Sequence, residues 1–233
     1  WIKKVKVAVQ FLNAKERWCL WLVEATTDDL KSMPLVLERV NKVAEVRKRN
    51  SDKSVQKLAC RPHQFRDINN PKSYILVPGV SSERRTYIPI GFFGGDVIST
   101  NKNFILPEGS LYEFGILTSI IHNDWMRLVS MRLESRYSYG NKVVYNTFPW
   151  PDVTNAQRKE IEVLAEEVIL TREEFPGQTL AELYDPDKMP SELLTAHQAL
   201  DKAVDRLYRE RPFKDTAERL SYLLARYERL AQK

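Results

Sequence analysis

The sequence is poor in cysteine and has no long apolar run. Its 233 residues include two cysteines, Cys19 and Cys60, which show no paired spacing. Two such cysteines do not build a disulfide framework and fit a reducing cytoplasm better. The apolar runs are too short for a bilayer, and residues 1–5 contain neither a Met nor a signal peptide's apolar stretch. We expect a cytoplasmic protein with no membrane partner, cut from a longer chain.

Signatures of common enzyme classes are also missing. The sequence contains no G-x-S-x-G, P-loop, H-E-x-x-H or C-x-x-C motif, and no Asp-Pro-Pro-Tyr or Asn-Pro-Pro-Tyr of adenine methyltransferases. Three scattered histidines do not pair a nucleophile with a base, and His63 lacks metal-ligand spacing. The glycines at 91, 94 and 95 fit turns better than a phosphate-binding loop. We expect no catalysis, metal or cofactor in this chain by itself.

Positive charge is concentrated in the first two thirds of the chain. Residues 1–150 hold 23 Lys and Arg against 14 Asp and Glu, a balance of +9, whereas residues 151–233 hold 13 against 17, a balance of −4. A basic region favours polyanionic partners, because neutralised phosphates release condensed counterions. The change falls at the Phe-Pro-Trp-Pro segment of residues 148–151, where proline ends regular structure. We therefore predict two domains, residues 1–151 and 152–233.

The apolar spacing predicts an α+β fold. We expect a mixed or antiparallel β-sheet domain with helices, followed by a small α-helical bundle. Strands are predicted in residues 1–26 and at 74–77, 86–90, 97–99 and 104–106. Helices are predicted at 28–49, at 110–131 and in four segments after residue 153, with a short helix in the loop of residues 51–73. Ser110 with Glu113 and Thr154 with Gln157 have capping-box spacing, and Ser191 and Asp215 are predicted caps.

Long polar side chains alternate with tyrosines in residues 131–151, between the predicted helix and the proline boundary. Such a surface is suited to reading a partner. The alternative is a charged hairpin with tyrosines packed beneath it.

If the partner is DNA, Arg pairs with guanine and Glu accepts from cytosine N4. Glu134 and Arg136 would project the same way from an extended strand and could read one C·G pair. The alternative for these two residues is a surface ion pair. Phosphate contacts, which set register and not sequence, are predicted for five residues: Arg84, Arg85, Lys142, Tyr139 and Tyr137.

Four segments, residues 17–22, 84–92, 135–139 and 144–151, resemble the C-terminal part of MmeI-like type II (IIG/IIL) restriction–modification enzymes. The resemblance implies that this chain is the target recognition domain and C-terminal helical region of a bacterial, cytoplasmic DNA adenine methyltransferase. It implies double-stranded DNA as a partner, together with the methyltransferase domain of the same parent chain. Catalysis and S-adenosylmethionine binding would belong to that domain, and the parent enzyme could also cleave DNA.

The resemblance also implies where specificity is determined. One pair of positions matches Glu134 and Arg136, and a second matches Lys102, with Asn101 beside it, and Ser138. We expect the second set to read a guanine.

The competing interpretation is a protein–protein docking or scaffold module of a DNA-modification complex, whose basic face meets an acidic partner. A type I specificity subunit normally carries two recognition halves, and the sequence shows no internal repeat.

Overall fold

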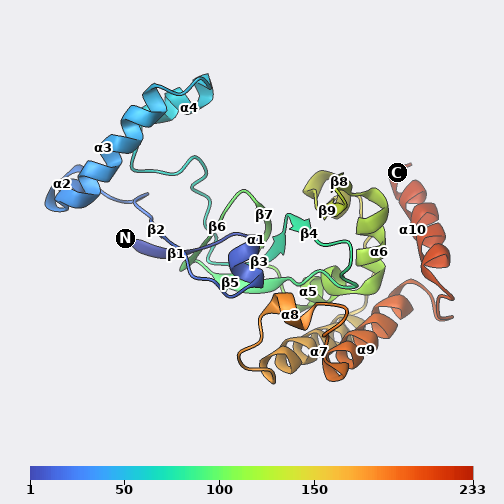
Figure 1. The fold of residues 1–233 in the computed structure, drawn as a ribbon. Coiled ribbons are helices and arrows are strands. Elements are labelled where there is room, and N and C mark those ends of the chain that lie inside the picture. Colours follow the sequence, from blue (N-terminus) through green and yellow to red (C-terminus); the bar gives the residue numbers. More distant parts are fainter. Residues whose placement is uncertain (233) are drawn as a thin grey trace. The chain divides into compact units, whose positions relative to one another are not determined.

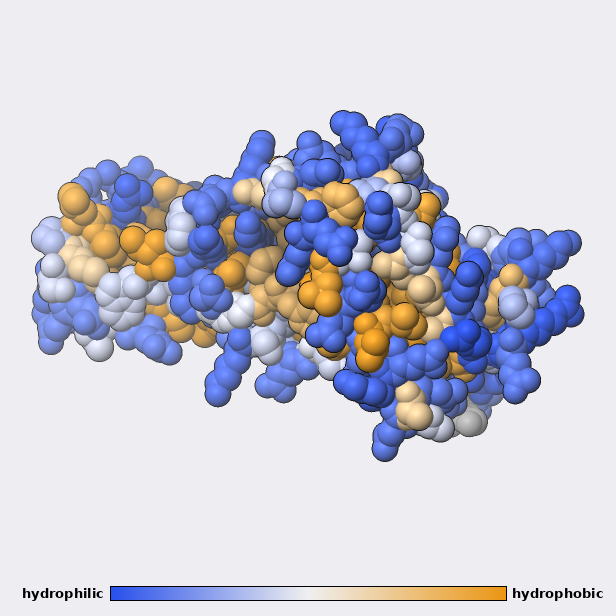
Figure 2. All heavy atoms as spheres, turned by 90° about the horizontal axis from the view of Figure 1, so that it is seen from below, coloured by the Kyte–Doolittle hydropathy of each residue, from blue (hydrophilic) through white to orange (hydrophobic). Residues whose placement is uncertain are grey.

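The structure is a computed structural model that describes residues 1–232 (Figure 1). It divides into two compact units, one of residues 1–4 and 18–70, the other of residues 5–17 and 71–233. None of the helices in the described range has the length and apolar character needed to cross a membrane. The face drawn in Figure 2 is mostly hydrophilic, with hydrophobic residues in several patches.

The first unit combines a strand pair with helices. Strands β1 (Ile2–Lys6) and β2 (Trp18–Leu20) pair antiparallel, with Lys3 opposite Cys19. The last two residues of β1 belong to the second unit. The helices are α2 (Thr27–Ser32), α3 (Pro34–Lys48), α4 (Lys53–Lys57) and the short 3₁₀ helix η1 (Leu58–Cys60). The prediction of one helix over 28–49 is wrong, because Pro34 begins a second helix there. Proline lacks the N–H that a continuing helix needs but suits a first turn.

The prediction of strands throughout residues 1–26 is also wrong in part. Residues Ala8–Leu12 form helix α1. Phe11 and Leu12, which are adjacent in sequence, are both buried in a small cluster with Tyr74 and Leu76. An alternating strand would turn one of two adjacent side chains away from the core, whereas a helix can bury both.

The second unit contains two antiparallel three-stranded sheets. In one, β3 (Ser73–Pro78) lies between β5 (Gly91–Gly94) and β7 (Asn103–Pro107). In the other, β9 (Arg136–Ser138) lies between β4 (Val80–Ser81) and β8 (Met131–Leu133). Strand β6 (Val97–Ser99) follows the turn after β5. The predicted strands at 74–77, 97–99 and 104–106 are confirmed.

The predicted strand at 86–90 is wrong, because its backbone bonds to side chains in place of a neighbouring strand. The Ile88 N–H donates to Asn123 Oδ1 at 3.1 Å, and the Ile90 carbonyl accepts from Arg172 Nη1 at 2.9 Å. Arg127 donates to the carbonyls of Arg85 and Thr86. These bonds satisfy the backbone of a buried segment without a β ladder.

The predicted helix over 110–131 is two helices, α5 (Leu111–Thr118) and α6 (Ile120–Val129). The capping box of Ser110 and Glu113 is confirmed at the start of α5. The break lies at Ser119, whose ψ of 158° is extended. Asn123 Nδ2 donates to the Thr118 and Ser119 carbonyls, which competes with the helical bonds there.

The C-terminal region is helical, as predicted. It contains α7 (Asn155–Glu173), α8 (Leu180–Leu183), α9 (Ser191–Tyr208) and α10 (Thr216–Ala231). The capping box of Thr154 with Gln157 and the cap by Asp215 are confirmed. The cap predicted for Ser191 is wrong: Pro190 precedes α9 and makes no side-chain cap bond, and Ser191 is the first helical residue.

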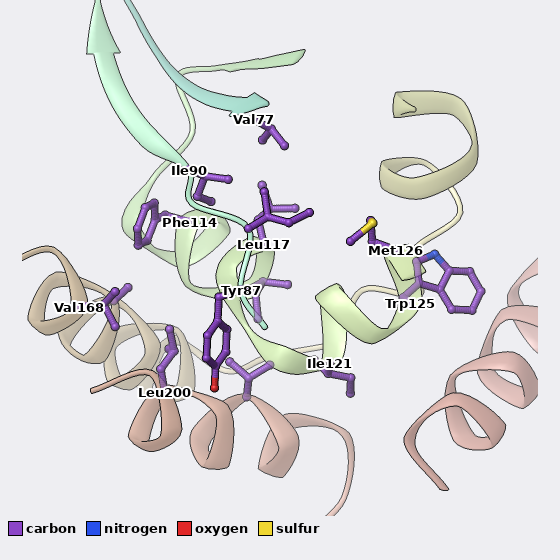
Figure 3. Close-up of a cluster of buried hydrophobic side chains, with 14 of the residues drawn as sticks. Val77, Tyr87, Ile90, Phe114, Leu117, Ile121, Trp125, Met126, Val168 and Leu200 are labelled. Carbon is purple, nitrogen blue, oxygen red and sulfur yellow. The ribbon is translucent and has the colours of Figure 1, made fainter. Parts of the chain in front are cut away.

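One hydrophobic core joins the β-sheets to these helices. It extends from Ile75 to Leu223 and includes side chains of α5, α6, α7, α9 and α10, part of which Figure 3 shows. Gly115 in α5 allows close packing on α7, because a Cβ there would lie 2.7 Å from Ile161 Cγ2. The observed fold is therefore the predicted α+β class with a helical C-terminal region. The domain boundary between 151 and 152 stays a prediction.

Candidate nucleic-acid interface

Strands β8 and β9 form a hairpin, which we call the reading hairpin (residues 131–138). Leu133 pairs with Arg136, so Glu134 and Ser135 form a two-residue turn. Glu134 has φ +58°, a left-handed conformation that two-residue hairpin turns require and that glutamate adopts infrequently. The premise that Glu134 lies on an extended strand is therefore wrong.

The side chains of Glu134 and Arg136 nevertheless meet. Arg136 Nη2 donates to Glu134 Oε2 at 2.6 Å, and the two side chains are 45% and 77% exposed. The ion pair that the sequence left open as an alternative is thus present. An exposed pair of this kind contributes little to stability, so another polar partner can replace it at small cost.

Arg132 contacts this turn and stabilises it. The sequence analysis did not single out Arg132. Its guanidinium lies 3.8 Å from the centre of the Tyr137 ring, and its Nη1 donates to the Ser135 carbonyl at 3.0 Å. Arg132 and Tyr137 are cross-strand partners. A two-residue turn places residues i and i+5 opposite each other, so this spacing was a signal once the turn was recognised.

Gly79 joins the turn at Lys102 to the end of the reading hairpin. The Gly79 N–H donates to the Lys102 carbonyl at 3.1 Å, and the Gly79 carbonyl accepts from the Tyr139 N–H at 3.0 Å. Ser138 pairs with Val80, the next residue. The backbone thus holds the segments of Lys102 and Ser138 on two sides of one glycine. Lys102 is exposed and Ser138 half-buried.

Asn101 and Lys142 are both exposed, and they lie in separate elements. Asn101 precedes Lys102 in the turn between β6 and β7. Lys142 lies in a single π-helical turn, η2 (Asn141–Tyr145), after the reading hairpin. Their contacts with DNA stay predictions.

The two arginines predicted to hold phosphates have different surroundings. Arg84 is exposed and pairs with Asp187, a contact that raises the pKa of the Arg84 guanidinium. Arg85 is half-buried, and burial lowers its pKa. Its buried Nε has no hydrogen-bond partner within the described part of the chain. A phosphate contact by Arg85 would use its outer guanidinium nitrogens, because its Nε is buried, whereas Arg84 must leave a carboxylate to reach a phosphate.

Tyr137 and Tyr139 are buried beneath the hairpin. The Tyr139 hydroxyl lies 3.1 Å from Nε2 of His122, and burial raises the pKa of Tyr139. This arrangement matches the alternative of a charged hairpin over packed tyrosines, with His122 buried and hydrogen-bonded to Tyr139. Phosphate contacts by the two tyrosines stay predictions.

Metal-binding groups and disulfides are not found in residues 1–232. No group of three or more His, Cys, Asp or Glu side chains in that range could hold a metal ion. Cys19 and Cys60 are free.

The whole chain is similar to known proteins. Residues 1–152 match the family model "MmeI, target recognition domain", and residues 153–233 match "MmeI, C-terminal domain". A relative, DNA methyltransferase A of Bacillus subtilis (strain 168), is 42% identical over the whole chain, which spans 26% of that protein.

A solved structure of the Type IIL restriction-modification enzyme MmeI in complex with DNA is similar to this chain. It has 42% sequence identity and a TM-score of 0.97, and the match covers 100% of this chain and 31% of the enzyme. The chain thus spans less than a third of either relative. With both family models matching along its length, this chain belongs to the MmeI family, as a target recognition domain followed by a C-terminal domain.

Proposed function

We propose that this chain recognises a specific double-stranded DNA sequence on behalf of an N6-adenine DNA methyltransferase of which it is one part. The observation that carries the proposal is the reading hairpin, which presents Glu134 from its turn and Arg136 from its second strand as an exposed pair. Support comes from the target recognition family and from the DNA complex of the similar enzyme. Recognition by this chain and catalysis by another domain would account for the absence of a methyltransferase motif.

The paired side chains suit one C·G base pair. Arg136 can donate two hydrogen bonds to guanine O6 and N7, and Glu134 can accept from cytosine N4. In the free chain the two side chains bond to each other. On binding, the base pair takes the place of this exposed ion pair, so that neither charged group is left without a partner. A good bidentate contact distinguishes bases by about 1–3 kcal/mol.

We infer a second contact with a DNA base from the hydrogen bonds around Gly79. The Lys102 carbonyl accepts a hydrogen bond from Gly79, and Asn101 lies beside Lys102. Ser138 pairs with Val80, the residue after Gly79. We assign them to the reading of a guanine, for which Lys supplies a donor. Lys142, Arg84 and Arg85 contact phosphates and set the register of the protein on DNA.

The parent protein supplies the chemistry. Its methyltransferase domain binds S-adenosylmethionine and transfers the methyl group, and it is the intramolecular partner of this chain. The name of the Bacillus relative supports methyl transfer as the activity of the whole protein. We place the enzyme in the bacterial cytoplasm, where its DNA lies.

Mapping N6-methyladenine by single-molecule sequencing tests the proposal. DNA from a host that expresses the parent enzyme is compared with DNA from hosts that express Arg136→Ala or Arg206→Ala. Arg206 forms an exposed pair with Glu160 away from the hairpin and is the matched control. Arg136→Ala should relax one base of the methylated motif, and Arg206→Ala should leave the motif intact. An unchanged motif in Arg136→Ala would show that Arg136 is structural.

A further inference from the structure

The C-terminal helix α9 caps the start of α6. Asp201 Oδ1 accepts the Ile120 N–H at 2.7 Å, and its Oδ2 accepts the Tyr87 hydroxyl at 2.6 Å. Ser119, the residue before α6, makes no side-chain cap bond of its own. A helix start needs acceptors for its free N–H groups. For α6 one such acceptor comes from a residue 81 positions later.

The last helix, α10, holds the middle of α6. Arg219 donates to Asp124 Oδ2 at 2.8 Å and to Asp205 Oδ2 in α9 at 3.3 Å. The side chains of Asp124 and Arg219 are 3% and 15% exposed, so this ion pair is largely shielded from solvent. About two turns further along α10, the Tyr227 ring lies 5.8 Å from the Trp125 ring. Helices α9 and α10 thus attach to α6 at separate points.

Both ends of the reading hairpin are tied to α6 (Figure 1). Its first strand begins at Met131, one residue after Ser130, whose N–H bonds to the Met126 carbonyl at 2.9 Å. Just beyond its second strand, the Tyr139 hydroxyl bonds to His122. The position of the hairpin therefore depends on α6 as well as on β4 and Gly79, with which its second strand pairs.

We propose that Arg219 and Asp201 are positioning residues for base readout. By holding α6, they allow the C-terminal helices to fix the position of Glu134 and Arg136 relative to the DNA bases. This inference rests on the proposed function. Both residues are largely buried, so they act through α6 and not by touching a base. Base discrimination requires hydrogen bonds of about 2.7–3.2 Å, so a small displacement of the hairpin weakens cognate contacts selectively.

The test uses the parent enzyme with Arg219→Gln, the milder Tyr227→Ala and the control Arg206→Gln. Methylation rates are compared on the duplex methylated by the wild type and on one altered at the C·G pair assigned to Glu134 and Arg136. We expect the ratio of the two rates to fall about tenfold in Arg219→Gln, less in Tyr227→Ala, and to stay constant in Arg206→Gln. A merely structural role would lower both rates together through loss of folded enzyme and leave the ratio unchanged.

Hydrogen exchange without DNA gives a second readout. Arg219→Gln should accelerate exchange in residues 120–138 and leave β3 protected as in the wild type. The positioning role alone is overturned if Arg136→Ala lowers the ratio while Arg219→Gln leaves the ratio unchanged, whatever the exchange shows. Both proposals are overturned if Arg136→Ala leaves the ratio unchanged.

Discussion

Gly79 and Lys102 approach so closely that only glycine fits. A Cβ on residue 79 would lie 2.4 Å from the Lys102 carbonyl oxygen, the atom that accepts the Gly79 N–H. The same glycine accepts from Tyr139 at the end of the reading hairpin. One residue thus couples two segments that we assign to base readout.

Gly79→Ala should separate these segments. The added methyl group meets backbone atoms that cannot rotate away, so we expect a loss of about 1–3 kcal/mol in the free energy of unfolding. Urea unfolding of the chain measures this loss. In the parent enzyme the variant should weaken selection of the guanine assigned to Lys102 and Ser138. An unfolding midpoint equal to that of the wild type would contradict the steric argument.

Exchanging the charges of the reading pair should change the preferred base. Glu134→Lys with Arg136→Asp reverses which side chain donates and which accepts, so the enzyme should prefer G·C where the wild type prefers C·G. Sequencing of methylated host DNA measures the motif. Each single variant should lower methylation more than the double variant, because it leaves two like charges beside each other. Methylation of the original motif by the double variant would refute the assignment.

Glu134→Gly should separate stability from selectivity. Glu134 occupies a left-handed conformation that costs a non-glycine residue about 1 kcal/mol, and glycine adopts it without strain. We expect an equal or higher unfolding temperature together with weaker selection of the C·G pair. Glu134→Ala is the matched control, since it removes the carboxylate and keeps the strain. A clear loss of stability in Glu134→Gly would mean that the ion pair with Arg136 outweighs the backbone strain.

Asp201 should make stability depend on pH. Burial raises its pKa from 3.8 to about 7, against the opposing effect of the Tyr87 and Ile120 hydrogen bonds. Between these pKa values the folded chain holds a proton that the unfolded chain has released. The contribution of Asp201 is therefore complete below about pH 4, and it is lost as the pH rises through about 7.

Asp201→Asn removes this titration and keeps an acceptor for the Ile120 N–H. The difference in unfolding free energy, wild type minus variant, should decrease between about pH 4 and pH 8, as urea unfolding measures. A constant difference across that range would show that Asp201 is ionised throughout.

Local features were predicted well because their causes lie within a few residues. The capping boxes of Ser110 with Glu113 and Thr154 with Gln157 need only an i, i+3 spacing. The strands at 74–77 and 104–106 follow from short runs of β-forming residues. The exposed turn of Asn101 and Lys102 follows from polar composition in the same way.

The failures share a different cause. Residues 86–90 have strand composition, yet their backbone bonds to Asn123, Arg127 and Arg172, which lie 35 to 82 positions away. Residues 8–12 alternate like a strand over part of their length, but packing of Phe11 on β3 selects a helix. In both places tertiary contacts outweighed local preference.

The sequence by itself determined the α+β class, the helix caps, the resemblance to MmeI-like enzymes and the presence of an acid and a base two residues apart. Only the tertiary structure decided that Glu134 adopts a left-handed conformation and pairs with Arg136. It also decided that Gly79 bonds to the segments of Lys102 and Tyr139, and that Asp201 caps α6. A cap or a strand depends on neighbouring residues, whereas the contacts of Gly79 and Asp201 exist only after distant parts of the chain have packed together.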